Sequence, residues 1–165
     1  MRREEYKFPI NGNQLGIFPM LRTLEPLFVE HESRRINSVY FDDSSFTCFI
    51  QGEEGLTPRR KVRARWYGTS APSEADIRFE LKFTYHNDRE KCLYSFEEAS
   101  DKNSPYPWAL EIMLGKLHPV CKVSYDRDYY KSHQGIRVTI DRNITYSKSN
   151  GVWSNDSTVM MDDMS

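Results

Sequence analysis

The 165-residue sequence is poor in the features that mark several common protein classes. Its three cysteines are odd in number and share no CxxC or zinc-ligand spacing, so a reduced intracellular compartment fits them better than a disulfide framework. No apolar run approaches the roughly 18–20 residues that cross a bilayer, and the N-terminus lacks the apolar core of a signal peptide. We therefore expect a cytoplasmic protein with no membrane segment.

An excess of charge of one sign is absent as well. Lys and Arg number 23 against 24 Asp and Glu, a net charge of −1, which argues against a polycation that coats nucleic acid. Aromatic residues make up 13% of the chain, too many for a disordered polypeptide. The length predicts one domain with one core. The sequence also lacks a Gly-rich phosphate loop, a Ser-His-Asp order and metal-spaced histidines.

Most of the chain alternates between apolar and polar residues, which predicts a strand-dominated α+β fold. The candidate strands are residues 3–10, 36–43, 59–67, 77–85, 91–96, 121–130 and 136–144. Helical periodicity predicts a helix from Gln14 to about Val29, with Pro26 ending or kinking it, and a second from Pro105 to before Pro119. We expect one domain over residues 1–146, followed by a polar loop or frayed tail over residues 147–165.

Basic residues recur on one face of the candidate strands, because side chains at i and i+2 share a face. Residues 59–67 place Lys61, Arg63 and Arg65 opposite Val62, Ala64 and Trp66. An antiparallel sheet with one solvated face also alternates, but successive like charges on one face repel unless anions lie between them. Arginine offers a planar fork for phosphate oxygens, and lysine a point charge. The pattern therefore favours binding of a linear polyphosphate, in a lumen if the sheet closes.

Single carboxylates accompany the cationic faces, namely Glu5, Glu80 and Asp141. Mg²⁺ and Mn²⁺ prefer such hard oxygen ligands and bridge them to phosphate, so these residues are the candidate metal ligands. The basic stretch 59–65 could bind RNA as a surface patch, but its regular alternation favours a lumenal face. The Tyr129-Tyr130 pair is more typical of a core or rim than of a base-stacking platform.

Several runs of the sequence together resemble the VTC domain, the polyphosphate-polymerase branch of the CYTH-like triphosphate tunnel metalloenzymes. They stand in the family's order between residues 3 and 145: Glu5–Lys7, Ile36–Asp42, Lys61–Gly68, Phe79–Lys82, Lys91, Tyr125–Arg127 and Arg137–Asp141. The resemblance implies an antiparallel β-barrel, the triphosphate tunnel, with about two covering helices. Its lumen would bind triphosphate or polyphosphate together with a divalent metal.

The resemblance also implies roles for single residues. The implied phosphate ligands are Lys7, Arg63, Arg65, Lys82, Lys91, Arg127 and Arg137, with Lys61 beside them on its strand face and Tyr125 as a hydrogen-bond donor to the same phosphate chain. In polymerase members the terminal phosphate of a growing chain attacks a nucleoside triphosphate, and the cationic lumen stabilises the transferring phosphoryl group. We expect Arg63, Arg65, Lys82, Arg127 and Arg137 to have that catalytic role here.

The sequence after Asp141 departs from the family pattern. Nothing in residues 147–165 matches the Leu-Glu-x-Lys-like strand whose glutamate is the family's principal metal ligand, so we expect a barrel that lacks its last strand. Three functions stay open. The first is metal-dependent phosphoryl transfer, either polyphosphate synthesis from ATP or another nucleoside triphosphate or triphosphate hydrolysis. The second is a non-catalytic polyphosphate- or nucleotide-binding module, and the third is an antiparallel barrel that carries some other small anion. If the charged faces line a lumen, outward apolar side chains such as Phe79, Leu81 and Phe83 favour a homodimer or extra packing by the tail.

Overall fold

The computed structural model describes residues 4–10, 19, 22–23, 26–69, 71–86, 88–100, 116–149 and 159–161. Strands dominate this part of the chain, which confirms the predicted α+β class. The strands are β1 (Leu27–Asp42), β2 (Arg59–Tyr67), β3 (Arg78–Tyr85), β4 (Asp88–Ser95), β5 (His118–Ser132), β6 (Arg137–Lys148) and β7 (Val159–Met161). Helices α2 (Thr47–Glu53) and α3 (Phe96–Ser100) and the 3₁₀ turn η2 (Glu74–Asp76) connect them.

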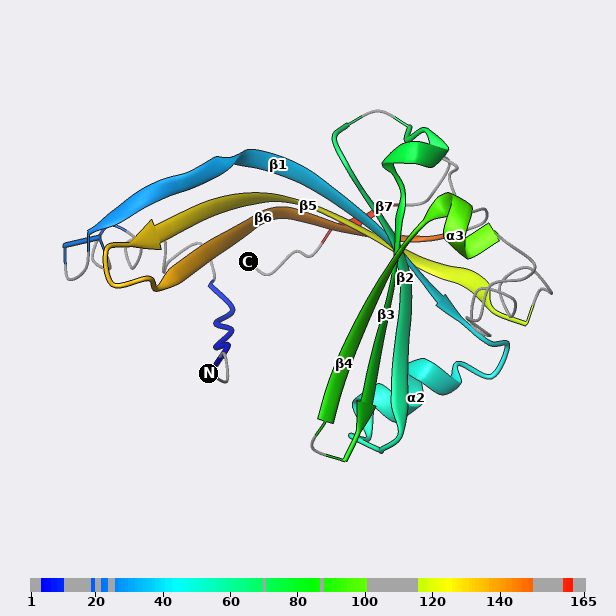
Figure 1. Ribbon diagram of the computed structural model, residues 1–165. Coiled ribbons are helices and arrows are strands. Elements are labelled where there is room, and N and C mark those ends of the chain that lie inside the picture. The colour runs from blue at the N-terminus through cyan, green and yellow to red at the C-terminus, as the bar shows by residue number, and fades with distance from the viewer. Residues whose placement is uncertain are drawn as a thin grey trace.

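All the strands belong to one antiparallel sheet, with the order β4-β3-β2-β1-β5-β6-β7. The sheet is bent, so that β1, β5 and β6 arch away from β2, β3 and β4 and enclose a concave face with them (Figure 1). We call the two parts the arched half and the straight half. Over the described residues the sheet keeps two edges, β4 and β7, so it is not a closed barrel and is compatible with an open, tunnel-like one.

The apolar core lies on the opposite face of the straight half. Val62, Ala64 and Trp66 of β2 are buried there, together with Phe79 of β3. They pack in one cluster with Ala99 of α3, and Figure 1 shows both helices on this side of the sheet. The cluster is thus buried within a single copy of the chain. The predicted homodimer stays a prediction.

The register agrees with the alternation for most predicted strands, and β2 coincides with the predicted strand 59–67. The end of the first predicted helix is wrong, because Leu27–Val29 begin β1 and pair with Ser132, Lys131 and Tyr130 of β5. Residues 19 and 22–23 of that helix are helical, and the rest of it lies outside the described residues. Residues 101–115, with most of the second predicted helix, lie outside them too.

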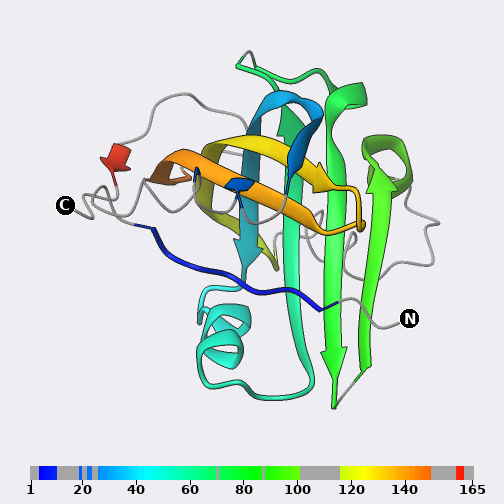
Figure 2. The same cartoon turned by 90° about the vertical axis from the view of Figure 1, so that its left-hand side faces the viewer.

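The two ends of the chain differ from the prediction in opposite ways. Residues 4–10 form no strand, because an alternating segment needs a hydrogen-bonded neighbour and none pairs with them in the described sheet. Their Tyr6 and Phe8 are 75% and 78% exposed. The predicted loop at the C-terminus is wrong for residues 159–161, which add β7 to the edge of β6 opposite Thr145–Ser147. Figure 2 shows the N-terminal segment crossing the concave side of the sheet.

Candidate functional site

A row of lysines crosses the straight half of the sheet. Lys61 of β2 lies directly opposite Lys82 of β3, and Lys82 lies directly opposite Lys91 of β4. Like charges at directly opposed positions destabilise a sheet unless an anion lies between them. The neighbouring cross-strand pair places Arg63 opposite Glu80. Strand register cannot be derived from the alternation of residues, so only the structure shows that these lysines are aligned across three strands.

Glu80 is the carboxylate at the centre of this cationic group. Its Oε2 accepts hydrogen bonds from Arg63 Nε at 2.7 Å and from Arg63 Nη2. Its Oε1 lies 3.8 Å from Arg65 Nη1 and 3.6 Å from Lys91 Nζ. Burial alone would raise the pKa of the Glu80 carboxyl, but these neighbours, with Arg63 foremost, lower it below its ordinary value. Glu80 is therefore ionised at neutral pH and holds the basic side chains in place.

Lys82 is a cation of this group that forms no ion pair among the described residues. Burial lowers the pKa of its ammonium group, and the charges of Arg63 and Lys91 lower it further against the opposing effects of Glu80 and Glu5. Among the ion pairs of the described residues none includes Lys82. The Lys82 side chain is exposed, and an ammonium that forms no ion pair beside other cations is suited to accept an anionic ligand. We call Arg63, Arg65, Lys82 and Lys91, with Glu80, the cationic cluster.

Two side chains of the neighbouring strand β1 orient Arg63 and Arg65. Arg63 Nη1 donates to Tyr40 Oη at 3.2 Å, and Arg65 Nε donates to Ser38 Oγ at 3.2 Å. These partners oppose the arginines in the β1–β2 register. Sequence reasoning assigned no role to Tyr40 or Ser38, although their alternation within 36–43 already placed both on one strand face. The hydrogen bonds leave other guanidinium N–H groups to meet a ligand.

The arched half brings a second group to the concave face. Both oxygens of Asp141 on β6 accept from Arg127 on β5, at 2.6 Å from Nε and 2.7 Å from Nη2. The Arg127 guanidinium lies 5.1 Å from the ring centre of Tyr125. Burial raises the pKa of the Tyr125 phenol, and Arg127, Arg65 and Arg63 oppose this shift. Tyr125 is thus a neutral hydrogen-bond donor close to both halves of the sheet.

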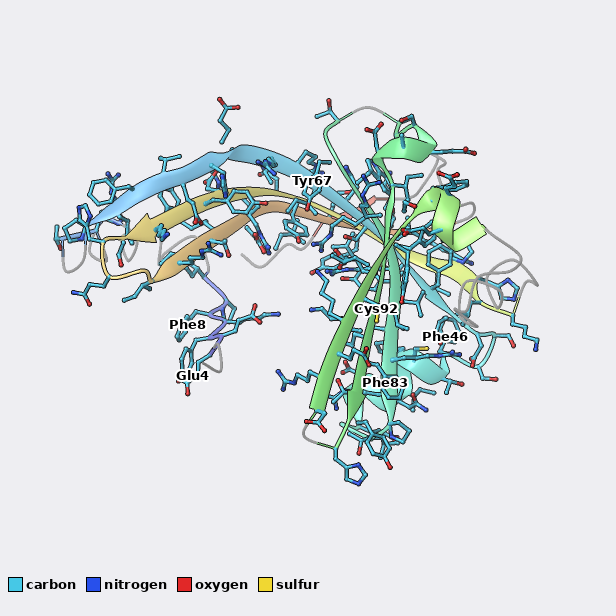
Figure 3. The ribbon with its side chains drawn as sticks, viewed as in Figure 1. Glu4, Phe8, Phe46, Tyr67, Phe83 and Cys92 are labelled. Atoms are coloured by element: carbon cyan, nitrogen blue, oxygen red, sulfur yellow. The ribbon has the colours of Figure 1, made fainter. Side chains whose placement is uncertain are left out.

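The other predicted phosphate ligands form no ion pair with Glu80 among the described residues. Arg137 forms an ion pair with Glu30 at 3.2 Å, four residues along β6 from Asp141. Lys61 is exposed, and its Cε lies beside Gly52 of α2. Lys7 is exposed on the N-terminal segment, below the arched half where Figure 3 labels Glu4 and Phe8. The structure therefore unites four of the predicted cations in the cluster and Arg127 with Tyr125 next to it.

The three candidate metal ligands do not form a metal centre. The oxygens of Glu80 and Asp141 are taken by arginine and lysine, and Glu5 stands on the N-terminal segment near Lys82. Across the described ranges, no three His, Cys, Asp or Glu side chains gather closely enough to hold a metal ion. The donors present thus do not fit a metal carried by the protein alone. The predicted Mg²⁺ or Mn²⁺ cofactor stays a prediction.

The arrangement suits an anion with several charges in a line. Basic residues stand at every second position of β2, and basic side chains of β3, β4 and β5 lie on the same face of the sheet. Arginine forks bind phosphate oxygens in pairs, and a low-dielectric surface strengthens each contact. The same donors can stabilise charge that develops on a phosphoryl group during transfer.

Comparison with known proteins agrees with this chemistry. The family model of the VTC domain matches residues 2–164. No curated protein matches the chain. Within the part of the chain that the structure describes, no helix is long and apolar enough to cross a membrane.

Proposed function

Because this chain belongs to the VTC domain family, which is associated with polyphosphate metabolism, we propose that its concave face binds triphosphate or polyphosphate and transfers a phosphoryl group. The donor would be ATP or another nucleoside triphosphate, and a divalent metal would accompany it. The acceptor would be the terminal phosphate of a polyphosphate chain or a water molecule. The single observation that supports the proposal best is the cationic cluster around Glu80, with the uncompensated Lys82 at its edge.

The proposed reaction needs positioning more than covalent chemistry from the protein. An oxygen of the acceptor forms a bond to the γ-phosphorus, the bond to the β,γ-bridging oxygen breaks, and the nucleoside diphosphate leaves. Arg63 and Arg65 hold the non-bridging oxygens, since their orientation is set by Glu80, Tyr40 and Ser38. Lys82 is the free point charge that neutralises the transferring group.

A second candidate function is a binding module that does not catalyse transfer. One observation favours it: the carboxylates of Glu80 and Asp141 are both paired with arginine, and among the described residues no three candidate ligands gather around a metal position. Such a module would retain polyphosphate or a nucleotide on the same cations. The two candidates share the binding site and differ only in turnover.

Binding of inorganic tripolyphosphate, measured by calorimetry, tests the shared part of both candidates. Arg63→Ala and Arg65→Ala should abolish binding while the circular dichroism spectrum stays that of a folded sheet. Arg142→Ala is the matched control, because Arg142 pairs with Asp128 on β5 and neighbours Asp141 on the opposite strand face. Unchanged binding in either cluster variant would refute the proposal.

Incubation with ATP and Mn²⁺, followed by detection of polyphosphate and of released phosphate, separates the two candidates. Product formation that Lys82→Met abolishes supports phosphoryl transfer. Binding without product supports the module.

A further inference from the structure

A patch of two tyrosines and one arginine lies on the concave face beside the cationic cluster. The Arg34 guanidinium carbon is 5.9 Å from the ring centre of Tyr67 and 5.8 Å from that of Tyr129. The cation is therefore in contact with two aromatic rings from different strands. Tyr67 is 50% exposed and Arg34 is exposed, so the patch is open to solvent. We call these residues the tyrosine–arginine patch.

The patch continues the line of the cluster. Tyr67 ends β2 and follows Arg63 and Arg65 at the next position of the same strand face, about 7 Å farther along. Tyr129 shares its face of β5 with Tyr125 and Arg127. Burial raises the pKa of the Tyr129 phenol, and the charges of Arg127, Arg34 and Arg65 and the Tyr67 phenol act on it too. Figure 3 shows Tyr67 next to the arched half, far from Phe83 at the other end of the straight half.

The chemistry of the patch differs from that of the cluster. A polyphosphate chain offers only charged oxygens, which gain little from an aromatic ring. A nucleobase offers a flat face, and such faces stack on tyrosine rings and on arginine planes. Tyr129 was assigned from the sequence to a core or rim, but its neighbours Tyr67 and Arg34, which the sequence does not bring together, supply the second ring and the cation.

We propose that the tyrosine–arginine patch is the base-binding subsite of a nucleoside triphosphate whose phosphates lie on the cationic cluster. This inference rests on the proposed function and adds the direction in which the nucleoside triphosphate lies on the concave face. The base stacks on Tyr67 and Tyr129, the ribose spans the step to Arg65, and the triphosphate runs along β2 past Arg63. The terminal phosphate then lies toward Lys82 and Lys91, at the end of the site where an acceptor must enter.

Calorimetric titration with two ligands, ATP and inorganic tripolyphosphate, tests the inference. Tyr67→Ala and Tyr129→Ala should each weaken ATP binding about tenfold, which is typical for the loss of one stacked base. Both variants should bind tripolyphosphate within twofold of the wild type. Tyr67→Phe should restore ATP binding, because it keeps the ring. Tyr85→Ala is the matched control, since Tyr85 is similarly exposed at the end of β3, on the strand face opposite Lys82.

The outcomes separate this inference from the proposed function. Loss of ATP binding alone, with rescue by Tyr67→Phe, supports the base subsite. Equal loss for both ligands, or no loss for either, overturns the subsite while the proposed function stands. If the wild type binds neither ligand, the proposed function fails, and the subsite with it.

Discussion

The charge of Glu80 should be the largest single electrostatic contribution to the stability of this site, and Glu80→Gln tests that expectation. The substitution keeps the size of the side chain and one carbonyl oxygen, and it removes the negative charge between Arg63, Arg65 and Lys91. The side chains of Glu80 and Arg63 are 6% and 15% exposed, so water cannot take the place of the lost partner.

The magnitude follows from the distances. At 3.6–3.8 Å and an effective dielectric constant near 20, each of the Arg65 and Lys91 contacts contributes a gross attraction of about 4–5 kcal/mol. Desolvation of the carboxylate offsets most of this sum. Removal of the carboxylate charge nevertheless leaves the largely buried guanidinium groups of Arg63 and Arg65 without a counter-charge, and such a loss typically lowers the free energy of unfolding by about 3–5 kcal/mol. We expect a loss in that range.

The pH dependence of stability distinguishes the loss of the Glu80 charge from a merely steric effect of the substitution. The pKa of Glu80 is lowered in the folded protein, so its contribution is complete above the unfolded value of about 4.3 and disappears as the pH falls through the lowered folded value. Urea unfolding followed by circular dichroism from pH 7 to pH 3 should therefore show a gap between wild type and Glu80→Gln that closes at acid pH. Tripolyphosphate should restore part of the stability at pH 7, because it replaces the lost negative charge.

Glu32→Gln is the matched control, since Glu32 is an exposed glutamate of β1 and none of the described ion pairs includes it. It should change the free energy of unfolding by less than about 0.5 kcal/mol. The reasoning fails if Glu80→Gln unfolds at the same urea concentration as the wild type, or if the gap keeps its size at pH 3.

Three further variants test other parts of the structure. Lys82→Met should raise the free energy of unfolding by about 0.5–1 kcal/mol, because it removes a cation that its neighbours repel. The same variant should bind tripolyphosphate at least about tenfold more weakly. If it is destabilised instead, Lys82 has a stabilising partner. Asn37→Ala removes hydrogen bonds to Ser124 and Gly68 on the opposite face, so it should lower stability by about 1–3 kcal/mol in chemical denaturation and leave tripolyphosphate binding unaltered in calorimetry. Asp141→Asn breaks the partly exposed Asp141–Arg127 ion pair, which is worth about 0.2–1 kcal/mol. Because Arg127 is then released from Asp141, calorimetry should show tighter tripolyphosphate binding. A loss of Mn²⁺-dependent activity in this variant would instead identify Asp141 as a metal ligand.

The strands of the straight half were the most predictable part of the fold. Alternation between Arg63 and its apolar neighbours sets the faces of β2 without reference to any other segment, and so the strand and its cationic face both follow from the sequence. The register does not follow, because it depends on which residues the turns bring opposite one another. The opposition of Arg63 to Glu80 and of Lys82 to Lys91, and hence the shape of the cluster, had to come from the structure.

The missed elements depend on partners outside the segment itself, one close in sequence and one distant. Of the residues in 47–53, Thr47, Phe49 and Ile50 are β-branched or aromatic. Helix α2 forms because the Asp42 carboxylate accepts hydrogen bonds from the backbone N–H groups of Cys48 at 2.8 Å and Phe49 at 2.9 Å. The apolar spacing of Leu24 and Phe28 suggested a helix, but pairing with β5 makes Leu27 the first residue of β1. In the first case a nearby carboxylate decided the conformation, and in the second a strand distant in sequence decided it.

The central β1–β5 pairing also has a consequence for the order of folding. It joins Asp42 to His118 and Leu27 to Ser132, whereas β2, β3 and β4 each pair with the strand that follows or precedes them in the chain. The chain between Asp42 and His118 must close into a loop before the β1–β5 contacts can form, and this closure costs chain entropy. The local β2–β3–β4 meander should therefore form early and the β1–β5 ladder late. Tyr125 and Arg127 come near Arg65 only through that ladder. A phosphate chain bound across both halves would therefore stabilise the last step of folding, and refolding kinetics with and without tripolyphosphate would report on the assembly of the site itself.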